Sequence, residues 1–209
     1  WGGILEKVMI ADIPDEWLFD TLMIDEGQDF EEEWYEILKL FLKDDGAIVW
    51  LEDPLQNIYG KKQITLDGFV HYRCNKNYRT PISIANYIKE ALDIDFETEN
   101  ELMGLEVGQI EVTTSEAQQA QVRETIKKLI SKGFTGKDIA VISAKGAQNS
   151  LFSKLDKIGK YSLRKFSGDY DAQGNQIYTE GEIIFDSIYR FKGNQSPAVI
   201  LVDVERSKE

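Results

Sequence analysis

The sequence has few of the residues that crosslink a fold or cross a membrane. Its 209 residues include one cysteine, one histidine and four prolines. A single cysteine excludes an internal disulfide, and no run of about 18 apolar residues suggests a membrane span. Basic residues are also scarce, because 24 Lys and Arg stand against 37 Asp and Glu, a formal net charge of −13. We therefore expect a soluble, cytoplasmic protein in which any contact with nucleic acid is local.

The residues that are present are sufficient for a globular core, since 42% are hydrophobic. Apolar runs alternate with helical periods, which predicts an α/β fold with a largely parallel sheet. The polar and glycine residues at 59–68 are the expected boundary between two domains. The runs expected to form strands are residues 19–24, 47–51, 110–114, 139–143, 182–188 and 198–204.

Three helices are expected between these strands. Asp29 is the expected cap of the first helix, and Gly46 its expected end. Thr80 would cap the second helix, and Ser115 with Gln118 would form a capping box for the third. The apolar positions expected to face the core are Trp34, Ile37, Leu38, Phe41 and Leu42, then Ile84, Ala85, Ile88 and Leu92, and finally Val122, Ile126, Leu129 and Ile130.

Two adjacent carboxylates, Asp25 and Glu26, follow the apolar run of residues 19–24. Neighbouring carboxylates repel each other and resist the loss of water, so this pair favours a cation or a reacting group. One of them could hold Mg²⁺ while the other deprotonates a water molecule, as phosphoryl transfer requires. On spacing alone, a solvated turn is the commoner structure in so acidic a chain.

Three further stretches follow along the chain: WLEDPLQNIYG from Trp50, NYRTPISIAN from Asn77 and SIYRFKGNQS from Ser187. Together with DEGQDF at residues 25–30, their order resembles that of the UvrD/Rep-type superfamily 1 DNA helicases. The resemblance extends over residues 19–204. Four motifs in the correct order are more specific than any one of them.

The resemblance implies RecA-like domains of the P-loop NTPase type. Residues 1–62 would be the C-terminal part of the first motor domain, and residues 69–209 would be most of the second. Residues 93–180 match the family only in the alternation of strands and helices. The implied activity is ATP-dependent translocation on single-stranded DNA, with RNA not excluded as a substrate.

The resemblance also implies roles for individual residues. Asp25 would coordinate Mg²⁺, and Glu26, beside the same metal, would be the general base for the attacking water. Gln28 and Gln56 would sense the terminal phosphate of ATP, which suits an amide because it both donates and accepts hydrogen bonds. Arg79 would reach that phosphate from the second domain, where a planar donor suits the developing charge.

The implied contacts with single-stranded DNA come from two segments. Tyr59 would stack on a base, a contact that contributes about 1–3 kcal/mol and tolerates any sequence. Ser187, Tyr189 and Lys192 would lie along the DNA, with Tyr189 at a position where many family members have histidine. Without the resemblance, the ordinary interpretation of Tyr59 is a polar turn and that of Arg79 is a surface residue.

The sequence also departs from the family. It has no glycine-rich loop ending in Gly-Lys-Thr or Gly-Lys-Ser, and GFTGKD at 133–138 has the wrong spacing, so we interpret that stretch as a helix-to-strand turn. Gly193 and Gln195 occupy the nucleotide-contacting positions of the last motif, where Gln195 replaces an acid. Because the phosphate-binding loop is lacking, the resemblance implies binding of ATP and Mg²⁺ only by an intact protein that includes the missing remainder of the polypeptide. The isolated chain is expected to be inactive.

Two features imitate metal sites. The stretch DYDAQGNQIYTE at 169–180 is close to an EF-hand loop in spacing, but its strand-like flanks predict a hairpin turning at 173–175. His71 and Cys74 lie three residues apart without a second pair of ligands, so we interpret both as structural.

Two other classes of function stay open at this point. The chain could be a non-catalytic module that binds nucleic acid or protein and retains degenerate helicase motifs. It could also be a self-sufficient Mg²⁺ phosphohydrolase that uses Asp25 and Glu26, although no further acids stand at informative spacing near that turn. The sequence does not predict an oligomeric state.

Overall fold

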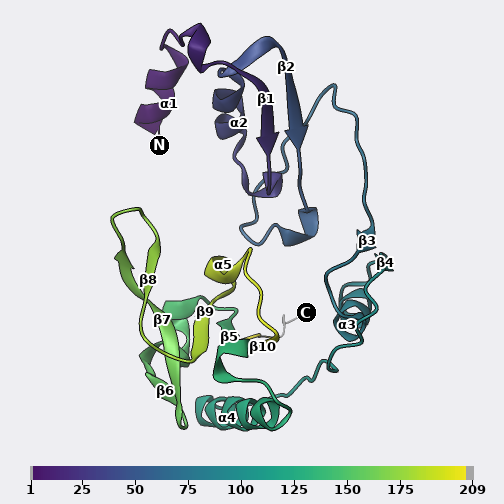
Figure 1. The fold of residues 1–209 in the computed structure, drawn as a ribbon, viewed down its shortest axis with the longest axis vertical. Coiled ribbons are helices and arrows are strands. Elements are labelled where there is room, and N and C mark those ends of the chain that lie inside the picture. The colour runs from purple at the N-terminus through teal and green to yellow at the C-terminus, as the bar shows by residue number, and fades with distance from the viewer. Residues whose placement is uncertain (1, 206–209) are drawn as a thin grey trace. The chain divides into compact units, whose positions relative to one another are not determined.

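The computed structural model describes residues 2–205, and the chain divides into two compact units, Trp1–Arg73 and Cys74–Glu209 (Figure 1). This division follows shortly after the expected boundary at 59–68. Both units combine helices with mostly parallel strands, which confirms the α/β class. Their assignment to two RecA-like motor domains stays a prediction.

The first unit is built on two parallel strands, β1 (Phe19–Ile24) and β2 (Leu42–Trp50). Helix α2 (Glu32–Lys39) connects them, and helix α1 (Gly2–Met9) precedes β1. The small core of this unit combines aliphatic side chains, such as Ile24 and Ile64, with aromatic ones. Trp50 meets Phe30 and Tyr35 edge to face, with ring centroids 5.8 and 5.2 Å apart.

The structure corrects the first expected helix. Helix α2 ends at Lys39 instead of continuing toward Gly46, and Glu31 rather than Asp29 precedes its first residue. Phe41 and Leu42 satisfy the helical period, but Leu42 already begins β2. Gly46 lies within β2, near an irregularity in the pairing with β1, and does not end a helix.

The second unit contains the larger sheet, with strand order β10-β5-β9-β7-β6. Strands β10, β5, β9 and β7 run parallel, while β6 and β8 are antiparallel to β7. A separate pair, β3 and β4, adjoins helix α3 in the sequence. The bounds are β3 (Lys76–Asn77), α3 (Ile82–Leu92), β4 (Glu97–Thr98), α4 (Ser115–Ser131), β5 (Ile139–Ser143), β6 (Lys157–Ile158), β7 (Tyr161–Tyr170), β8 (Gln176–Tyr178), β9 (Ile183–Ser187), α5 (Ile188–Phe191) and β10 (Ala198–Val202).

The core of the second unit forms where α4 packs on this sheet. Val122 and Ile126 of α4 are buried together with Val141 of β5 and Phe185 of β9. Burial of each large aliphatic side chain contributes about 1.5–3 kcal/mol, so this stripe accounts for much of the helix's attachment. The predicted stripe of α4 is confirmed, but Thr114, not Ser115, caps the helix by accepting from the backbone N–H of Ala117.

Other expectations for the second unit have mixed outcomes. Residues 110–114 are exposed and form no strand, so the strand predicted there is wrong. In α3, Ala85 is buried as predicted, but Ile84 and Leu92 are exposed. The turn predicted at 133–138 is confirmed as a connection from α4 to β5.

The predicted hairpin in 169–180 is also confirmed, with β7 and β8 as its two strands. The Asp171 carboxylate accepts from the backbone N–H groups of Gln173 and Asn175, which shapes the turn. The residues after the hairpin form β9, which pairs parallel with β7. Among the described residues, no helix is long and apolar enough to span a bilayer.

Candidate functional site

The turn after β1 places two carboxylates at the carboxyl edge of the β1–β2 pair. Glu26 adopts a left-handed backbone conformation, with φ 55° and ψ 40°, which costs a residue with a side chain about 1–2 kcal/mol. Its N–H donates to Asp25 Oδ1 at 2.9 Å. The carboxyl ends of parallel strands are where ligands bind in open α/β sheets, so this strained turn lies at the expected edge.

Gly27 is buried between that turn and the aromatic core. A Cβ atom there would lie 2.3 Å from Cε2 and 2.4 Å from Nε1 of Trp50, so no larger residue fits without displacing the indole. The Gly27 N–H donates to the carbonyl of Leu51 at 2.8 Å, which carries the pairing of β1 and β2 past the ends of the strands. Gly27 therefore fixes the position of Glu26 before it and Gln28 after it.

Gln28 connects the turn after β1 with the loop after β2 through its buried side-chain amide. Its Nε2 donates to Glu26 Oε2 at 2.6 Å, and its Oε1 accepts from the backbone N–H of Asp53 at 2.9 Å. A backbone N–H can only donate, so the amide has one possible orientation, with its NH₂ group toward Glu26. With only 6% of its surface exposed, Gln28 is a buried polar residue whose two ends are both satisfied.

Asp53 extends this arrangement to Gln56. Gln56 Nε2 donates to Asp53 Oδ2 at 2.7 Å, and Leu55 N–H donates to Asp53 Oδ1 at 3.1 Å. We call the connected residues Glu26, Gln28, Asp53 and Gln56 the Gln28 network. Three of the four were predicted from the sequence. Asp53 was missed, although an Asp directly before Pro54 is a typical cap for a short helical turn.

The chemistry of this edge fits a magnesium ion. Asp25 and Glu26 supply two carboxylates, and Mg²⁺ in proteins commonly takes one or two carboxylates together with water and substrate phosphates. Among residues 2–205, no group of three or more His, Cys, Asp or Glu is arranged to hold a metal ion. Two carboxylates by themselves would leave the other ligand positions of such an ion to water or to a bound ligand.

Tyr59 and Arg79 belong to different units. Tyr59 follows the short helical turn Pro54–Gln56 in the first unit, and its side chain is 46% exposed. Arg79 lies between β3 and α3 in the second unit, where Asn77 Oδ1 accepts from its N–H and Asn100 Nδ2 donates to its carbonyl. Its backbone is thus held in place while its side chain is exposed. In the described part of the chain, the guanidinium has no ion pair.

The remaining predicted residues surround α5 at the end of β9. Ser187 caps α5 by accepting from the Arg190 N–H at 3.4 Å, and Tyr189 is half-exposed on the helix. Lys192 follows the last helical residue. Gly193 has φ +79°, which favours glycine, and Gln195 is exposed after it. These residues form one segment, apart in sequence from the Gln28 network.

A buried carboxylate, Asp186, anchors this segment and was missed by the sequence analysis. Its Oδ1 accepts from Arg190 Nη1 at 3.0 Å and from the Ser187 N–H at 2.8 Å, while Tyr178 donates to Oδ2 at 3.3 Å. The Arg190 guanidinium also lies 4.3 Å from the ring of Phe166. Burial, and then the charge of Asp186, raise the pKa of Tyr178 above its ordinary value. The sequence offers one indication of this role, because Asp186 is an acid within an apolar run and stands four residues before Arg190.

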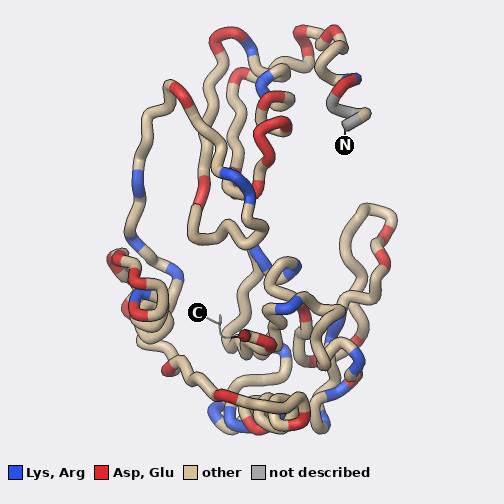
Figure 2. Tube along the Cα trace, turned by 180° about the vertical axis from the view of Figure 1, so that it is seen from behind, with Lys and Arg blue, Asp and Glu red and all other residues tan. Residues whose placement is uncertain are grey.

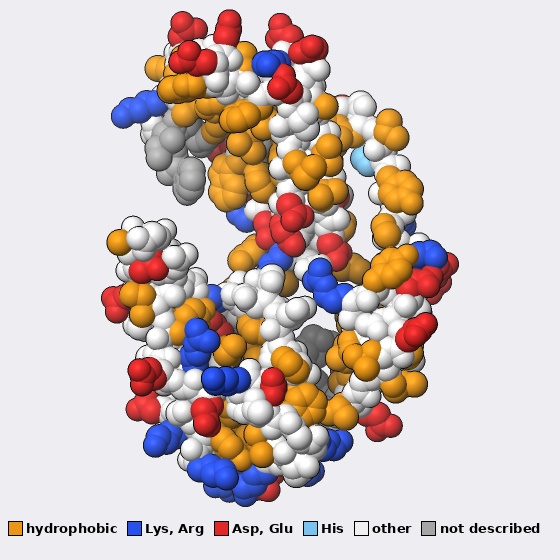
Figure 3. Space-filling view, viewed as in Figure 1, with side chains coloured by type: hydrophobic (Ala, Val, Ile, Leu, Met, Phe, Trp, Pro, Cys, Tyr) orange, Lys and Arg blue, Asp and Glu red, His pale blue; other side chains and the backbone are white. Residues whose placement is uncertain are grey.

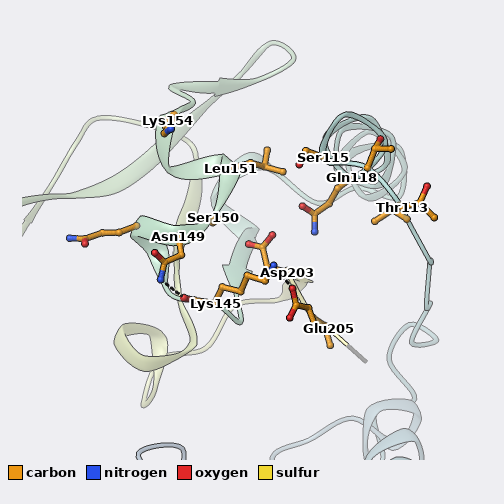
Figure 4. A pocket seen from close by; sticks show the side chains of 14 residues that line it. Thr113, Ser115, Gln118, Lys145, Asn149, Ser150, Leu151, Lys154, Asp203 and Glu205 are labelled. Atoms are coloured by element: carbon orange, nitrogen blue, oxygen red, sulfur yellow. Dashed lines mark hydrogen bonds and ion pairs between the residues drawn. The ribbon is translucent and has the colours of Figure 1, made fainter. Parts of the chain in front are cut away.

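A polar pocket of about 580 Å³ opens at the carboxyl ends of β5 and β10 (Figure 4). Ser143 Oγ donates to Asp203 Oδ2 at 2.7 Å, and Lys145 Nζ pairs with Glu205 Oε1 at 2.6 Å. None of the residues predicted to bind nucleotide or DNA lines this pocket. Because Lys145, Asp203 and Glu205 already pair with other groups of the chain, we assign this pocket no ligand.

Comparison with known proteins gives one informative similarity. No protein-family model matches the chain. Over 154 residues it is 27% identical to a probable DNA helicase II homolog of Mycoplasma capricolum subsp. capricolum. The match covers 65% of this chain and 21% of that protein, so the chain spans about a fifth of the length of the curated relative. The similarity supports a distant relationship between this chain and DNA helicases.

Proposed function

We propose that this chain is part of a UvrD/Rep-type superfamily 1 helicase that couples Mg-ATP hydrolysis to movement on single-stranded DNA. Residues 1–62 would belong to the first RecA-like motor domain and residues 69–209 to the second. The glycine-rich phosphate-binding loop would lie elsewhere in the same polypeptide, which we call the intact protein. The chain alone would then be inactive.

The observation that carries this proposal is the Gln28 network at the carboxyl edge of β1 and β2. It ties the candidate base, Glu26, to the loop that carries Gln56 and leads to the exposed Tyr59. The hydrogen bonds extend to Gln56, three residues before Tyr59, and a network of this kind can carry energetic coupling between two sites. The similarity to a DNA helicase homolog supports the same conclusion independently of this geometry.

In this proposal each residue has a defined task. Asp25 and Glu26 would hold Mg²⁺, which neutralises charge on the phosphates when it is bound. Glu26 would accept the proton of the attacking water, and Gln28 would hold the Glu26 carboxylate in place by donating to it. Arg79 would donate to the terminal phosphate from the second unit.

An uncovered sheet face supports the proposal that further polypeptide packs on the first unit. Phe19 and Met23 of β1 and Val49 of β2 all point to one exposed side, where Met23 is 69% exposed. Parallel strands are normally covered on both faces, and a two-stranded sheet is marginal by itself. Strands and helices from the rest of the intact protein would cover this face.

Gln28→Glu tests the coupling role with almost no change in size. The replacement puts a carboxylate oxygen where the amide donates to Glu26, so like charges face each other at hydrogen-bond distance. We expect the DNA-stimulated ATP hydrolysis of the intact protein to fall about 10- to 100-fold, because the displaced base is no longer aligned. The measurement is steady-state turnover with and without single-stranded oligo(dT).

Gln63→Glu is the matched control. Gln63 Nε2 also donates to a carboxylate of the first unit, Glu52 Oε1 at 3.0 Å, but it is exposed and lies outside the Gln28 network. We expect this variant to keep its turnover. Equal losses in both variants would show that the network has no specific role.

A further inference from the structure

The charges of this acidic chain are unevenly distributed. Residues 1–73 hold 17 Asp and Glu against 6 Lys and Arg, whereas residues 123–165 hold 11 Lys and Arg against 3 Asp and Glu. The tube coloured by residue charge shows acidic residues in red along α2 and basic residues in blue around α4 (Figure 2). A segment with a net charge of +8 inside a chain of net charge −13 requires a physical explanation.

Part of this basic segment serves the fold. Lys165 is largely buried, and its Nζ donates to the carbonyls of Ser153 and Leu155 and to Asp156. Arg164 lies over the ring of Tyr178, with 5.2 Å between the guanidinium carbon and the ring centroid. These two cations are therefore occupied within the second unit, as is Lys145 in its pair with Glu205.

Of the eight other basic side chains of the segment, all exposed, six gather on α4 and its C-terminal end and on β6 with the turn that follows it. Gly159 of that turn lies directly against Arg123, because a Cβ on Gly159 would be 3.3 Å from Arg123 Cδ. Figure 3 shows the basic side chains crowded over α4. We call this set the α4 basic surface, and it consists of Arg123, Lys127, Lys128, Lys132, Lys157 and Lys160.

Very little negative charge offsets the α4 basic surface. Within residues 123–132, Glu124 is the one acidic residue. Its Oε1 lies 2.8 Å from Lys127 Nζ and 3.8 Å from Arg123 Nε, so two cations share one carboxylate. Lys127, and then Arg123 and Lys128, hold the pKa of Glu124 below its ordinary value, which indicates a positive local field. In the part of the chain that the structure describes, Lys128, Lys132, Lys157 and Lys160 have no ion pair.

We propose that the α4 basic surface binds the phosphate backbone of a nucleic acid, as a contact separate from Tyr59 and the segment around α5. The proposal rests on the proposed function, because a chain that works on DNA meets a polyanion. A helix of 17 residues is about 25 Å long, which allows it to follow several successive phosphates. Exposed lysines without acidic partners bind phosphates without reading sequence.

The test compares two double variants of the 209-residue chain that change the net charge equally. Lys157→Gln/Lys160→Gln removes two cations of the α4 basic surface. Lys7→Gln/Lys89→Gln removes two cations elsewhere, of which Lys7 is exposed and Lys89 is partly exposed. The pairs are matched, since Lys160 and Lys89 each lie over an aromatic ring. Fluorescence anisotropy with labelled oligo(dT), measured over a range of salt concentrations, gives the affinity and its salt dependence.

We expect Lys157→Gln/Lys160→Gln to weaken binding about tenfold. The dependence of log affinity on log salt concentration should become less steep by about 1–2, because fewer phosphates are contacted. Lys7→Gln/Lys89→Gln should match the wild-type chain in both quantities. Equal slopes in all three proteins would overturn the proposal, as would no binding of oligo(dT) by the wild-type chain. Equally effective competition by polyglutamate would also overturn it, in favour of an acidic protein partner. The proposed function is tested separately, and it fails if Glu26→Gln does not lower ATP hydrolysis by the intact protein.

Discussion

Glu26→Gln is expected to lower the DNA-stimulated ATP hydrolysis of the intact protein by about 10²- to 10⁴-fold, the usual contribution of a general base. Glutamine keeps the size of the side chain but cannot accept a proton from the attacking water. Its amide oxygen can still accept from the NH₂ group of Gln28, as the Glu26 carboxylate does at 2.6 Å, so the substitution removes the base with little change in the contact. Steady-state turnover at saturating ATP and Mg²⁺ measures the effect.

Glu33→Gln is the control for this prediction. Glu33 lies in the first turn of α2 and is exposed, so the same change of charge occurs in the same unit away from the candidate site. Its turnover should equal that of the wild type. If Glu26→Gln hydrolyses ATP as fast as Glu33→Gln, the motifs do not form a hydrolytic site, and a non-catalytic binding module becomes the better interpretation.

Gly27→Ala is expected to destabilise the first unit by about 1–3 kcal/mol, the usual cost of overpacking a core. The added methyl group would lie 2.3 Å from the Trp50 indole, which is packed against Phe30 and Tyr35 and cannot move freely. All four tryptophans lie within residues 1–50. When the 209-residue chain is unfolded with denaturant, its tryptophan fluorescence therefore reports on the first unit alone.

The control for this second prediction is Gly3→Ala in α1, where a Cβ would have no neighbour within 4 Å. Alanine favours a helix over glycine, so stability should stay the same or rise slightly. Equal unfolding midpoints for Gly27→Ala and Gly3→Ala would mean that the Trp50 contact does not restrict the turn between Glu26 and Gln28.

The parts of the fold that were predictable from sequence are those in which one apolar run forms one buried element. Residues 19–24 and 139–143 are strands with the predicted ends, and each run is followed at once by a turn. The predicted bounds were wrong where the helical period of apolar residues continues into the following strand. Leu42 fits the period of the helix before it, yet it pairs with Phe19 as the first residue of β2.

The candidate site was predictable where side chains stand in recognisable order, as with Glu26, Gln28 and Gln56. Asp53 and Asp186 were not predicted, because each acts through hydrogen bonds that sequence does not display. Asp53 connects to Gln28 by its backbone N–H, 25 residues away, and Asp186 is reached by the Tyr178 hydroxyl from a neighbouring hairpin. Such roles depend on register and burial, which only the folded chain defines.

The most direct test of the account is ATP hydrolysis by the wild-type intact protein, measured with Mg²⁺ in the presence and absence of single-stranded oligo(dT). We expect turnover that requires Mg²⁺ and rises when oligo(dT) is added, because the Gln28 network connects Glu26 to the loop that precedes Tyr59. Turnover that is absent, or that is the same with and without oligo(dT), would contradict a DNA-coupled motor.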